Sequence, residues 1–326
     1  MSLELEIRRL RSWDGTDLAW YEGGDPDAPP MVLCGGLGGG VQIWQPLVER
    51  FADRYRLISF DYRGLYQSRR PRHDGAYDFI HHVRDLVHVL DHAEVETPVL
   101  VGWSMGVQVG LELHRDHPDR LSAMVAVHGT PGRPLARAFD SDLTERVAPW
   151  IFQLMRVVGS NLGLVGPTLA RTPIVVRSFV EIGRRLGCMS EDIDIEAFRD
   201  MAEDWTRLDL DAYARIFEAL GEHDASDLLP EIKTPTLVIA GGADRFTPQD
   251  LSEHMVATMP NASMQVVDGA THFGLIEYGH EITDAVEQFV DKGASIGKPG
   301  PSGAGGRGRR RARRGNGATR SKSLSA

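Results

Sequence analysis

Short apolar runs alternate with longer amphipathic stretches over most of the chain. Several of these runs predict strands, and each run ends on Gly, Asp or His. They cover residues 31–36, 56–61, 98–102, 122–129, 235–244 and 262–272. Between them, apolar residues recur at helical spacing over 79–90 and 105–115. Strands that alternate with helices are typical of a parallel sheet with crossover helices, so the pattern predicts an α/β fold.

The alternation changes at two places. Residues 4–10 and 17–23 predict an antiparallel hairpin around the turn at 13–16. Residues 131–230 carry amphipathic helical patterns and no strand pattern, and the strand pattern resumes at Thr234. We interpret this stretch as a helical insertion over the strand ends. An insertion at that place would form a lid and supply much of a substrate pocket.

The charge of the chain is unevenly distributed. The 326 residues are 42% hydrophobic and 25% charged, which is usual for a globular protein, and the net charge is -10. From Lys292 onward there are ten Lys or Arg and no Asp or Glu, so this segment has a charge of +10. Residues 1–291 therefore carry a net charge of about -20, which is -10 minus +10. The segment 292–326 has little to bury, and we expect it to be disordered. Its basic run, 307–315, could bind nucleic acid or an anionic membrane surface, but a solvated extension is the favoured interpretation.

Two further observations exclude classes of protein. The first residues carry frequent charges, and no stretch approaches the roughly 18 apolar residues of a membrane span, so we expect a cytoplasmic protein without a transmembrane segment. Cys34 and Cys188 are the only cysteines, which excludes a disulfide framework or a cysteine-based zinc cluster. The predicted organisation is thus an α/β core, a helical lid and a basic tail. These parts cover 1–130 with 231–291, 131–230, and 292–326, respectively.

A candidate nucleophile stands where an apolar run gives way to a helical pattern. Residues 100–108 read LVGWSMGVQ, so Ser104 is the serine of a G-x-S-x-G pattern and precedes a helix that begins at Met105. This context is that of a nucleophile elbow, in which Gly102 and Gly106 let the strand and the helix pass closely. Taken alone, the pattern fits a packed turn serine equally well.

A serine hydroxyl needs a histidine to take its proton and a carboxylate to hold that histidine. Asp244 and His272 follow the last two predicted strands, and the order Ser, Asp, His is that of the nucleophile-elbow enzymes. His128 also stands at a strand end, but no carboxylate lies near it in sequence. We therefore expect His128 to line the substrate pocket and His272 to be the base.

The Gly-rich loop 33–40, LCGGLGGG, follows an earlier strand. A nucleotide-phosphate cradle is one interpretation, but neither of the usual phosphate-binding patterns is satisfied. We favour an oxyanion hole made by the backbone N–H groups of Leu37 and Met105, the latter at a helix N-terminus. Gly36 and Trp103 are expected to bind the substrate beside it.

These segments together resemble the α/β-hydrolase superfamily, and specifically its lid-bearing, cofactor-independent members. The likeness extends from about residue 7 to residue 290 and rests on the joint order of five motifs. The motifs are CGGLGGGVQIW at 34–44, SFDYRGLYQSRRP at 59–71, the elbow region 85–129, IKTPTLVIAGGADRFTP at 232–248 and MPNASMQVVDGATHFGLIE at 259–277. The resemblance implies a mostly parallel eight-stranded sheet flanked by helices, with an all-helical lid between strands 6 and 7.

The resemblance also implies the roles of the site residues: Ser104 as nucleophile, His272 as base and then acid, and Asp244 as the group that orients His272. Relatives that are haloalkane dehalogenases or epoxide hydrolases attack with an aspartate, so the serine argues against both. We expect a hydrolase that cleaves a carboxylic ester of a small, largely apolar substrate through an acyl-enzyme. No metal, organic cofactor or obligatory protein partner is expected. Lactonase, C–C bond hydrolase, thioesterase and perhydrolase activities remain alternatives, as does a ligand-binding protein without catalysis.

Overall fold

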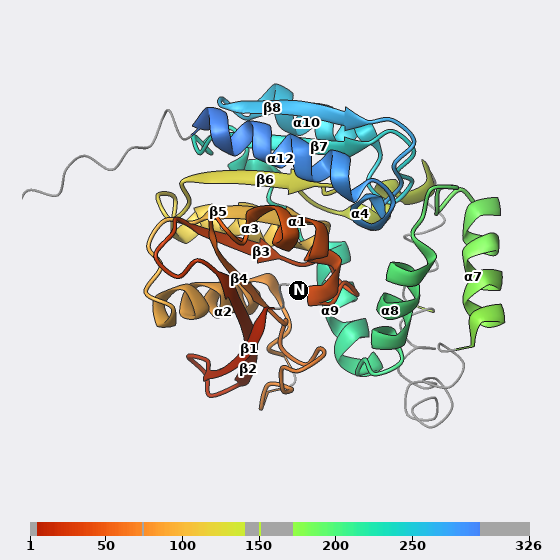
Figure 1. Cartoon of the computed structure of the whole chain (residues 1–326). Coiled ribbons are helices and arrows are strands. Elements are labelled where there is room, and N and C mark those ends of the chain that lie inside the picture. Colours follow the sequence, from red (N-terminus) through yellow and green to blue (C-terminus); the bar gives the residue numbers. More distant parts are fainter. Residues whose placement is uncertain (1–4, 74, 141–149, 151–171, 294–326) are drawn as a thin grey trace, which may run out of the picture.

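The structure, a computed structural model, describes residues 5–73, 75–140, 150 and 172–293. Its strands form one eight-stranded sheet of order β1-β2-β4-β3-β5-β6-β7-β8 (Figure 1). The strands are β1 Glu6–Arg11, β2 Asp17–Gly24, β3 Pro30–Cys34, β4 Arg56–Phe60, β5 Val99–Trp103, β6 Ala123–Val127, β7 Thr236–Gly241 and β8 Ala262–Val267. Strand β2 pairs antiparallel with β1 and β4, and the remaining neighbours pair in parallel. The predicted mostly parallel α/β sheet is therefore confirmed.

Helices cover both faces of this sheet. The helices and 3-10 turns are η1 Val41–Trp44, α1 Gln45–Phe51, α2 Phe79–His92, α3 Met105–Asp116, α4 Pro134–Arg137, η2 Ala138–Asp140, α7 Pro173–Arg185, α8 Ile195–Trp205, α9 Leu210–Glu222, η3 Ser226–Leu228, α10 Gln249–Thr258, α11 Gly274–Glu277 and α12 Gly279–Gly293. Helices α1 and α12 pack on one face, and α2, α3 and α10 pack on the other (Figure 1). The sheet is thus the middle of three layers.

The alternation of side chains along each central strand explains this layering. Successive residues of a strand point to opposite faces, so a strand buried on both faces is apolar throughout. In β3, Val32 packs with the core beside α2 and α3, whereas Leu33 packs with the core beside α1 and α12. Leu100 and Val101 divide in the same way in β5. Short continuous apolar runs therefore form the sheet.

The predicted strands over 235–244 and 262–272 are longer than the observed ones. Strand β7 ends at Gly241 and β8 ends at Val267. Turns follow both strands, because the N–H of Asp244 donates to the Gly241 carbonyl at 3.2 Å and the N–H of Ala270 donates to the Val267 carbonyl at 3.2 Å. The polar residues that close these two runs consequently lie in loops at the carboxyl edge of the sheet.

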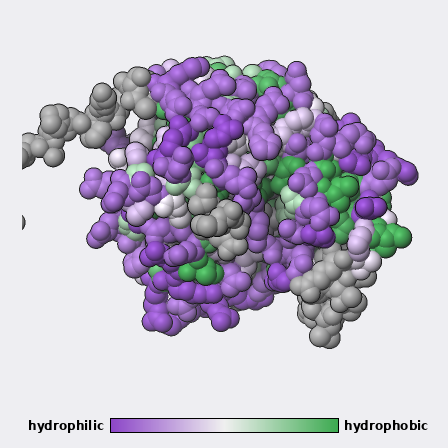
Figure 2. All heavy atoms as spheres, in the orientation of Figure 1, coloured by the Kyte–Doolittle hydropathy of each residue, from purple (hydrophilic) through white to green (hydrophobic). Residues whose placement is uncertain are grey.

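Between β6 and β7, the regular elements of the described chain are the helices and 3-10 turns α4, η2, α7, α8, α9 and η3, joined by loops, and Gly132 and Asp224 form one isolated antiparallel bridge. Residues 141–149 and 151–171 of the predicted insertion lie outside the described residues. Figure 2 shows apolar side chains gathered near α7 and α8 on an otherwise mostly hydrophilic face, and Ile174, Phe179 and Ile182 of α7 are each more than half exposed.

The end of the fold lies slightly later than the sequence predicts. Helix α12 continues through Lys292 to Gly293, so these two residues are the last helical residues of the described chain. The rest of the predicted tail, 294–326, lies outside the described residues. In the part of the chain that is described, no helix is long and apolar enough to cross a membrane.

Candidate active site

Ser104 lies in a sharp turn between β5 and α3, with φ 53° and ψ -116°. Its N–H donates to the carbonyl of Val127 in the neighbouring strand β6 at 3.0 Å, which anchors the turn. The flanking glycines are required by close backbone approach. A Cβ on Gly106 would lie 1.9 Å from the carbonyl oxygen of Cys34, and one on Gly102 would lie 2.7 Å from the Gly106 carbonyl carbon. The two glycines therefore let α3 start directly against the end of β3.

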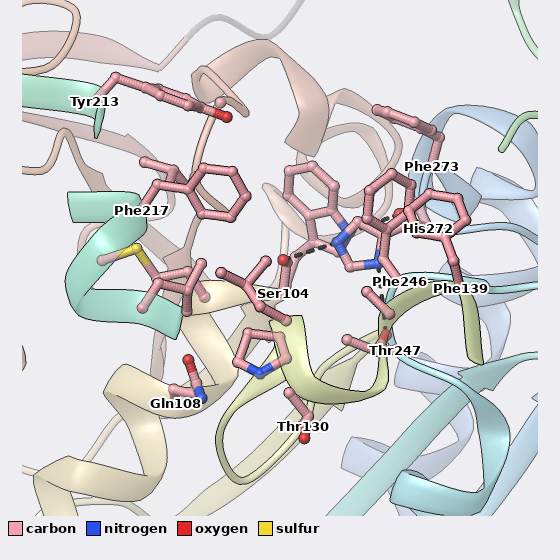
Figure 3. Close-up of a pocket in the computed structure, with 18 of the residues that line it drawn as sticks. Ser104, Gln108, Thr130, Phe139, Tyr213, Phe217, Phe246, Thr247, His272 and Phe273 are labelled. Atoms are coloured by element: carbon pink, nitrogen blue, oxygen red, sulfur yellow. Dashed lines mark hydrogen bonds between the residues drawn. The ribbon is translucent and has the colours of Figure 1, made fainter. Parts of the chain in front are cut away.

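The three residues predicted as nucleophile, base and acid are in contact, and Figure 3 shows two of them, Ser104 and His272, facing each other. His272 Nε2 is 2.8 Å from Ser104 Oγ, and His272 Nδ1 is 2.9 Å from Asp244 Oδ2. They come from three different loops, after β5, β7 and β8, at the carboxyl edge of the sheet. Parallel strands end at the same edge, which brings residues that are far apart in sequence together.

The carboxyl group of Asp244 is buried and fully engaged. Its Oδ1 accepts the N–H groups of Phe246 at 2.8 Å and Thr247 at 2.9 Å, and its Oδ2 accepts the hydroxyl of Thr247 at 2.7 Å. Burial by itself raises the pKa of Asp244, but the hydrogen bond from His272 and the proximity of the His272 and His128 rings outweigh it and hold that pKa well below its usual range. An ionised carboxylate accepts the Nδ1–H of His272, which leaves Nε2 free to accept a proton from Ser104.

The structure places His128 behind this carboxylate and not on the wall of the cavity. The residue is 1% exposed, and its Nδ1 is 3.6 Å from Asp244 Oδ2. Its ring fills a space left by glycines, since a Cβ on Gly274 would lie 2.5 Å from His128 Cε1. The N–H of His128 donates to the carbonyl of Ile239 in β7 at 2.9 Å, so pairing of β6 with β7 brings the histidine to the acid.

Two residues that line the cavity beside Ser104 have backbone N–H groups without a described acceptor. Leu37 and Met105 both line the cavity, and within the described residues no acceptor is found for either N–H group. Met105 is the first residue of α3, where the helix dipole is positive. An oxyanion requires backbone donors of this kind, and the assignment of Leu37 and Met105 stays a prediction.

Gly36 supports this loop from behind and is not among the residues found to line the cavity. A Cβ on Gly36 would lie 2.6 Å from the ring of Trp103 and 3.0 Å from Ser104 Cβ, so the glycine lets the loop lie against the elbow. Tyr62 Oη donates to the carbonyl of Gly35 at 2.7 Å and holds the loop from its other side. Trp103 lines the cavity, and its Nε1 donates to the carbonyl of His272 at 3.0 Å.

A cavity of about 380 Å³ opens over Ser104 and His272, which is within the range of small-molecule sites. Its described lining is dominated by apolar and aromatic side chains. They include Trp103, Leu135, Trp205, Phe217, Phe246 and Phe273. Leu135 comes from α4, Trp205 from α8 and Phe217 from α9, so the chain between β6 and β7 supplies a large part of the wall. Trp205 Nε1 also donates to the carbonyl of Gly38, which ties α8 to the Gly-rich loop.

Two residues of the site have no place in the sequence prediction. Thr247 holds the acid, and Gln108 of α3 lies in the cavity wall with 1% of its surface exposed. The sequence contains a signal for Thr247, because an aspartate often accepts the N–H groups two and three residues later in a turn. Among the described residues, no group of three or more His, Cys, Asp or Glu is arranged to hold a metal ion.

Comparison with known proteins gives consistent matches over most of the chain. A family model described as alpha/beta hydrolase fold matches residues 29–156, and one described as TAP-like protein matches residues 219–297. The chain is 27% identical to 3-oxoadipate enol-lactonase 2 of Acinetobacter baylyi, over 82% of this chain and 91% of that protein. It is 28% identical to the putative carbamate hydrolase RutD of Caulobacter segnis, over 78% of this chain and 86% of that protein.

Solved structures show the same fold. A hydrolase from Pseudomonas aeruginosa matches with a TM-score of 0.69 and 22% identity, over 87% of this chain and 98% of that chain. The enol-lactonase from Burkholderia xenovorans matches with a TM-score of 0.66 and 22% identity, over 87% of this chain and 100% of that chain. The sheet order, the strand–serine–helix turn and these matches agree with one another, and the chain therefore belongs to the α/β-hydrolase superfamily.

Proposed function

We propose that the protein is a serine hydrolase that cleaves a carboxylic ester of a small, largely apolar substrate through an acyl-enzyme. The observation that carries the proposal is the continuous contact from Ser104 Oγ through His272 to Asp244, at 2.8 and 2.9 Å, on the wall of an apolar cavity. The names of the relatives, which include an enol-lactonase and a putative carbamate hydrolase, support a hydrolase.

In the first step, Ser104 Oγ attacks the carbonyl carbon of the ester while His272 Nε2 takes the hydroxyl proton. Asp244 stabilises the imidazolium that forms and keeps the ring in the required tautomer. The carbonyl oxygen gains negative charge and accepts the N–H groups of Leu37 and Met105. By analogy with other oxyanion holes, removing one such donor slows the reaction about 10²- to 10³-fold.

His272 then gives its proton to the leaving alcohol oxygen as the C–O bond breaks, which completes acylation. The acyl group is then held as an ester of Ser104. A water molecule replaces the alcohol, gives a proton to His272 and attacks the same carbonyl carbon. The acid leaves, Ser104 regains its proton from His272, and the site returns to its starting state.

The helices between β6 and β7 act in this proposal as a lid over the site. Their side chains Leu135, Trp205 and Phe217 line the cavity, and burial of apolar substrate surface against them contributes about 25 cal/mol per Å². A wall of this kind favours a small apolar acyl or alcohol group. It also excludes water from the reacting centre, which strengthens the electrostatic interactions there.

The first experiment measures hydrolysis of p-nitrophenyl esters, from acetate to palmitate, by the wild type and Ser104→Ala. We expect turnover of the shorter esters by the wild type and loss of that turnover in the variant. Ser263→Ala, an exposed serine in β8, is the matched control and should retain activity. Equal rates for Ser104→Ala and the wild type would refute the assignment of the nucleophile.

A second measurement tests the covalent intermediate. Protein quenched in acid during turnover should carry one acyl group on the peptide that contains Ser104, as read by mass spectrometry. An acyl group on a different residue, or none during steady turnover, would argue against the acyl-enzyme.

A lactone is the second candidate substrate, because it is a cyclic ester and the chain is similar to an enol-lactonase. Ring opening follows the same steps, except that the leaving alcohol stays attached to the acyl group. A panel of simple lactones assayed beside the linear esters separates the two: a kcat/KM for a lactone well above that for every linear ester identifies a lactonase.

A further inference from the structure

The amide of Gln108 is a polar group in an apolar place. Gln108 lies one helical turn after Ser104 on α3, lines the same cavity and is 1% exposed. Within the described residues, neither its Oε1 nor its Nε2 has a hydrogen-bond partner. Buried amides in folded proteins are nearly always hydrogen-bonded, because an unpaired one loses its contacts with water and gains nothing in return.

No side chain of the described residues pairs with this amide. Thr130, which Figure 3 shows on the same side of the cavity, already bonds to Gly132 through its hydroxyl, at 3.1 Å to the carbonyl. The lining also includes Pro134, Leu135 and Leu220, which offer no side-chain donor or acceptor. Because Gln108 is one of the residues that line the cavity, a group bound there can supply the partner that the described residues do not.

We propose that Gln108 binds a neutral hydrogen-bonding group of the substrate, an amide or a hydroxyl, at a distance from the ester carbonyl. The inference rests on the proposed ester hydrolysis and adds a substrate class to it. A carboxamide side chain both donates and accepts, so its best complement is a group that does the same. No Lys, Arg, Asp or Glu stands among the described lining residues, and a charged substrate group would be buried without compensation.

The position of Gln108 sets the length of the substrate. Ser104 and Gln108 are four residues apart, which is about 6 Å along a helix axis. An extended chain advances about 1.2 Å per bond, so the polar group stands roughly four to seven bonds from the carbonyl carbon once side-chain reach is included. The preferred ester is therefore short, mainly apolar, and tipped with one neutral polar group.

The test uses pairs of p-nitrophenyl esters that differ only at the tip, a primary carboxamide in one and an isopropyl group of similar shape in the other. The readout is the ratio of kcat/KM for the amide-tipped ester to kcat/KM for the alkyl-tipped ester, at each acyl length. We expect the wild-type ratio to peak at one length within the stated window. In Gln108→Leu the ratio at that length should fall by about 10- to 100-fold. A second series carries the same tips on the alcohol side of acetate esters.

The ratio separates a specific effect from a general loss of activity, since damage to the catalytic groups lowers both rates of a pair. Gln249→Leu, a glutamine-to-leucine change on the surface helix α10, is the matched control and should leave the ratio unchanged. The melting temperature of Gln108→Leu should stay level or rise by about 1 to 4 °C, because an unpaired buried amide is removed. A melting temperature that falls by more than about 4 °C in Gln108→Leu would assign Gln108 a structural role and overturn the inference.

Binding to Ser104→Ala distinguishes failure of this inference from failure of the proposed function. Calorimetry should show tighter binding of the amide-tipped ester than of the alkyl-tipped one, and Ser104→Ala/Gln108→Leu should lose that preference. Ester turnover that depends on Ser104, with a flat ratio in both series, would refute the Gln108 site and leave the hydrolase intact. A Gln108-dependent binding preference without turnover of any ester would leave the polar site standing and refute the hydrolase.

Discussion

Arg63 provides a sharp test of the physical reasoning, because its removal leaves the buried carboxylate of Asp85 without its cationic partner and with only the Ser12 hydroxyl donating to it. Arg63 and Asp85 both have side chains with 0% exposure. The guanidinium donates to Asp85 through Nε at 2.7 Å and Nη2 at 2.6 Å, and through Nη1 to Asp14 at 2.9 Å. Breaking a buried pair by deleting one partner costs about 3 to 5 kcal/mol, so Arg63→Met should lower the free energy of unfolding by about that amount at neutral pH.

The loss should depend on pH. Burial raises the pKa of Asp85, and the hydrogen bonds and charge of Arg63 oppose that rise. Without Arg63 the folded-state pKa goes higher still, while in the unfolded chain it is about 3.9. Between these two values the folded state holds a proton that the unfolded state has released, so stability falls as pH rises through this window. Arg63→Met should therefore be least destabilised near pH 4 to 5 and most destabilised above neutral pH.

Urea unfolding of the wild type, Arg63→Met and Arg63→Met/Asp85→Leu at about pH 5 and pH 8 measures both effects. The double variant should recover most of the lost free energy at pH 8, because it removes the unpaired charge together with its partner. A loss below about 1 kcal/mol at pH 8, or the same loss at both pH values, would refute the reasoning.

Two further changes concern the site. Gly106→Ala puts a Cβ 1.9 Å from the carbonyl oxygen of Cys34, so α3 must move away from the loop that carries Leu37. Ester turnover should fall at least about 100-fold and the melting temperature should drop; a fully active variant would contradict this packing. Asp244→Asn keeps the shape of the acid but removes its charge. It should lower kcat about 10³- to 10⁴-fold, and a loss below tenfold would contradict the proposed role.

The sheet and the three contacting site residues were predictable because local signals mark them. Each central strand is a short apolar run, and Ser104, Asp244 and His272 each follow such a run. Parallel strands end at one edge of a sheet, so residues that follow different strands become neighbours without any pattern that links them in sequence. Chain order and strand ends were therefore sufficient to select His272 from twelve histidines.

The positions of His128, Gly36 and Gln108 depend on packing that leaves no local signal. His128 meets Asp244 because β6 pairs with β7, and a search for a nearby carboxylate in sequence does not find that partner. A side chain at Gly36 would project onto the ring of Trp103, and the sequence carries no sign of that contact. Gln108 reads as an ordinary polar residue of a helix, and only the surrounding apolar side chains show that its amide has no partner.

Two tryptophans border the cavity, and this gives the site an optical property. Trp103 bonds through its indole N–H to the carbonyl of His272, and Trp205 bonds in the same way to Gly38. Indole emission depends on the polarity and water content around the ring. A ligand that displaces solvent from the cavity thus changes the fluorescence of the protein itself, and occupancy can be titrated without a label or a chromogenic substrate.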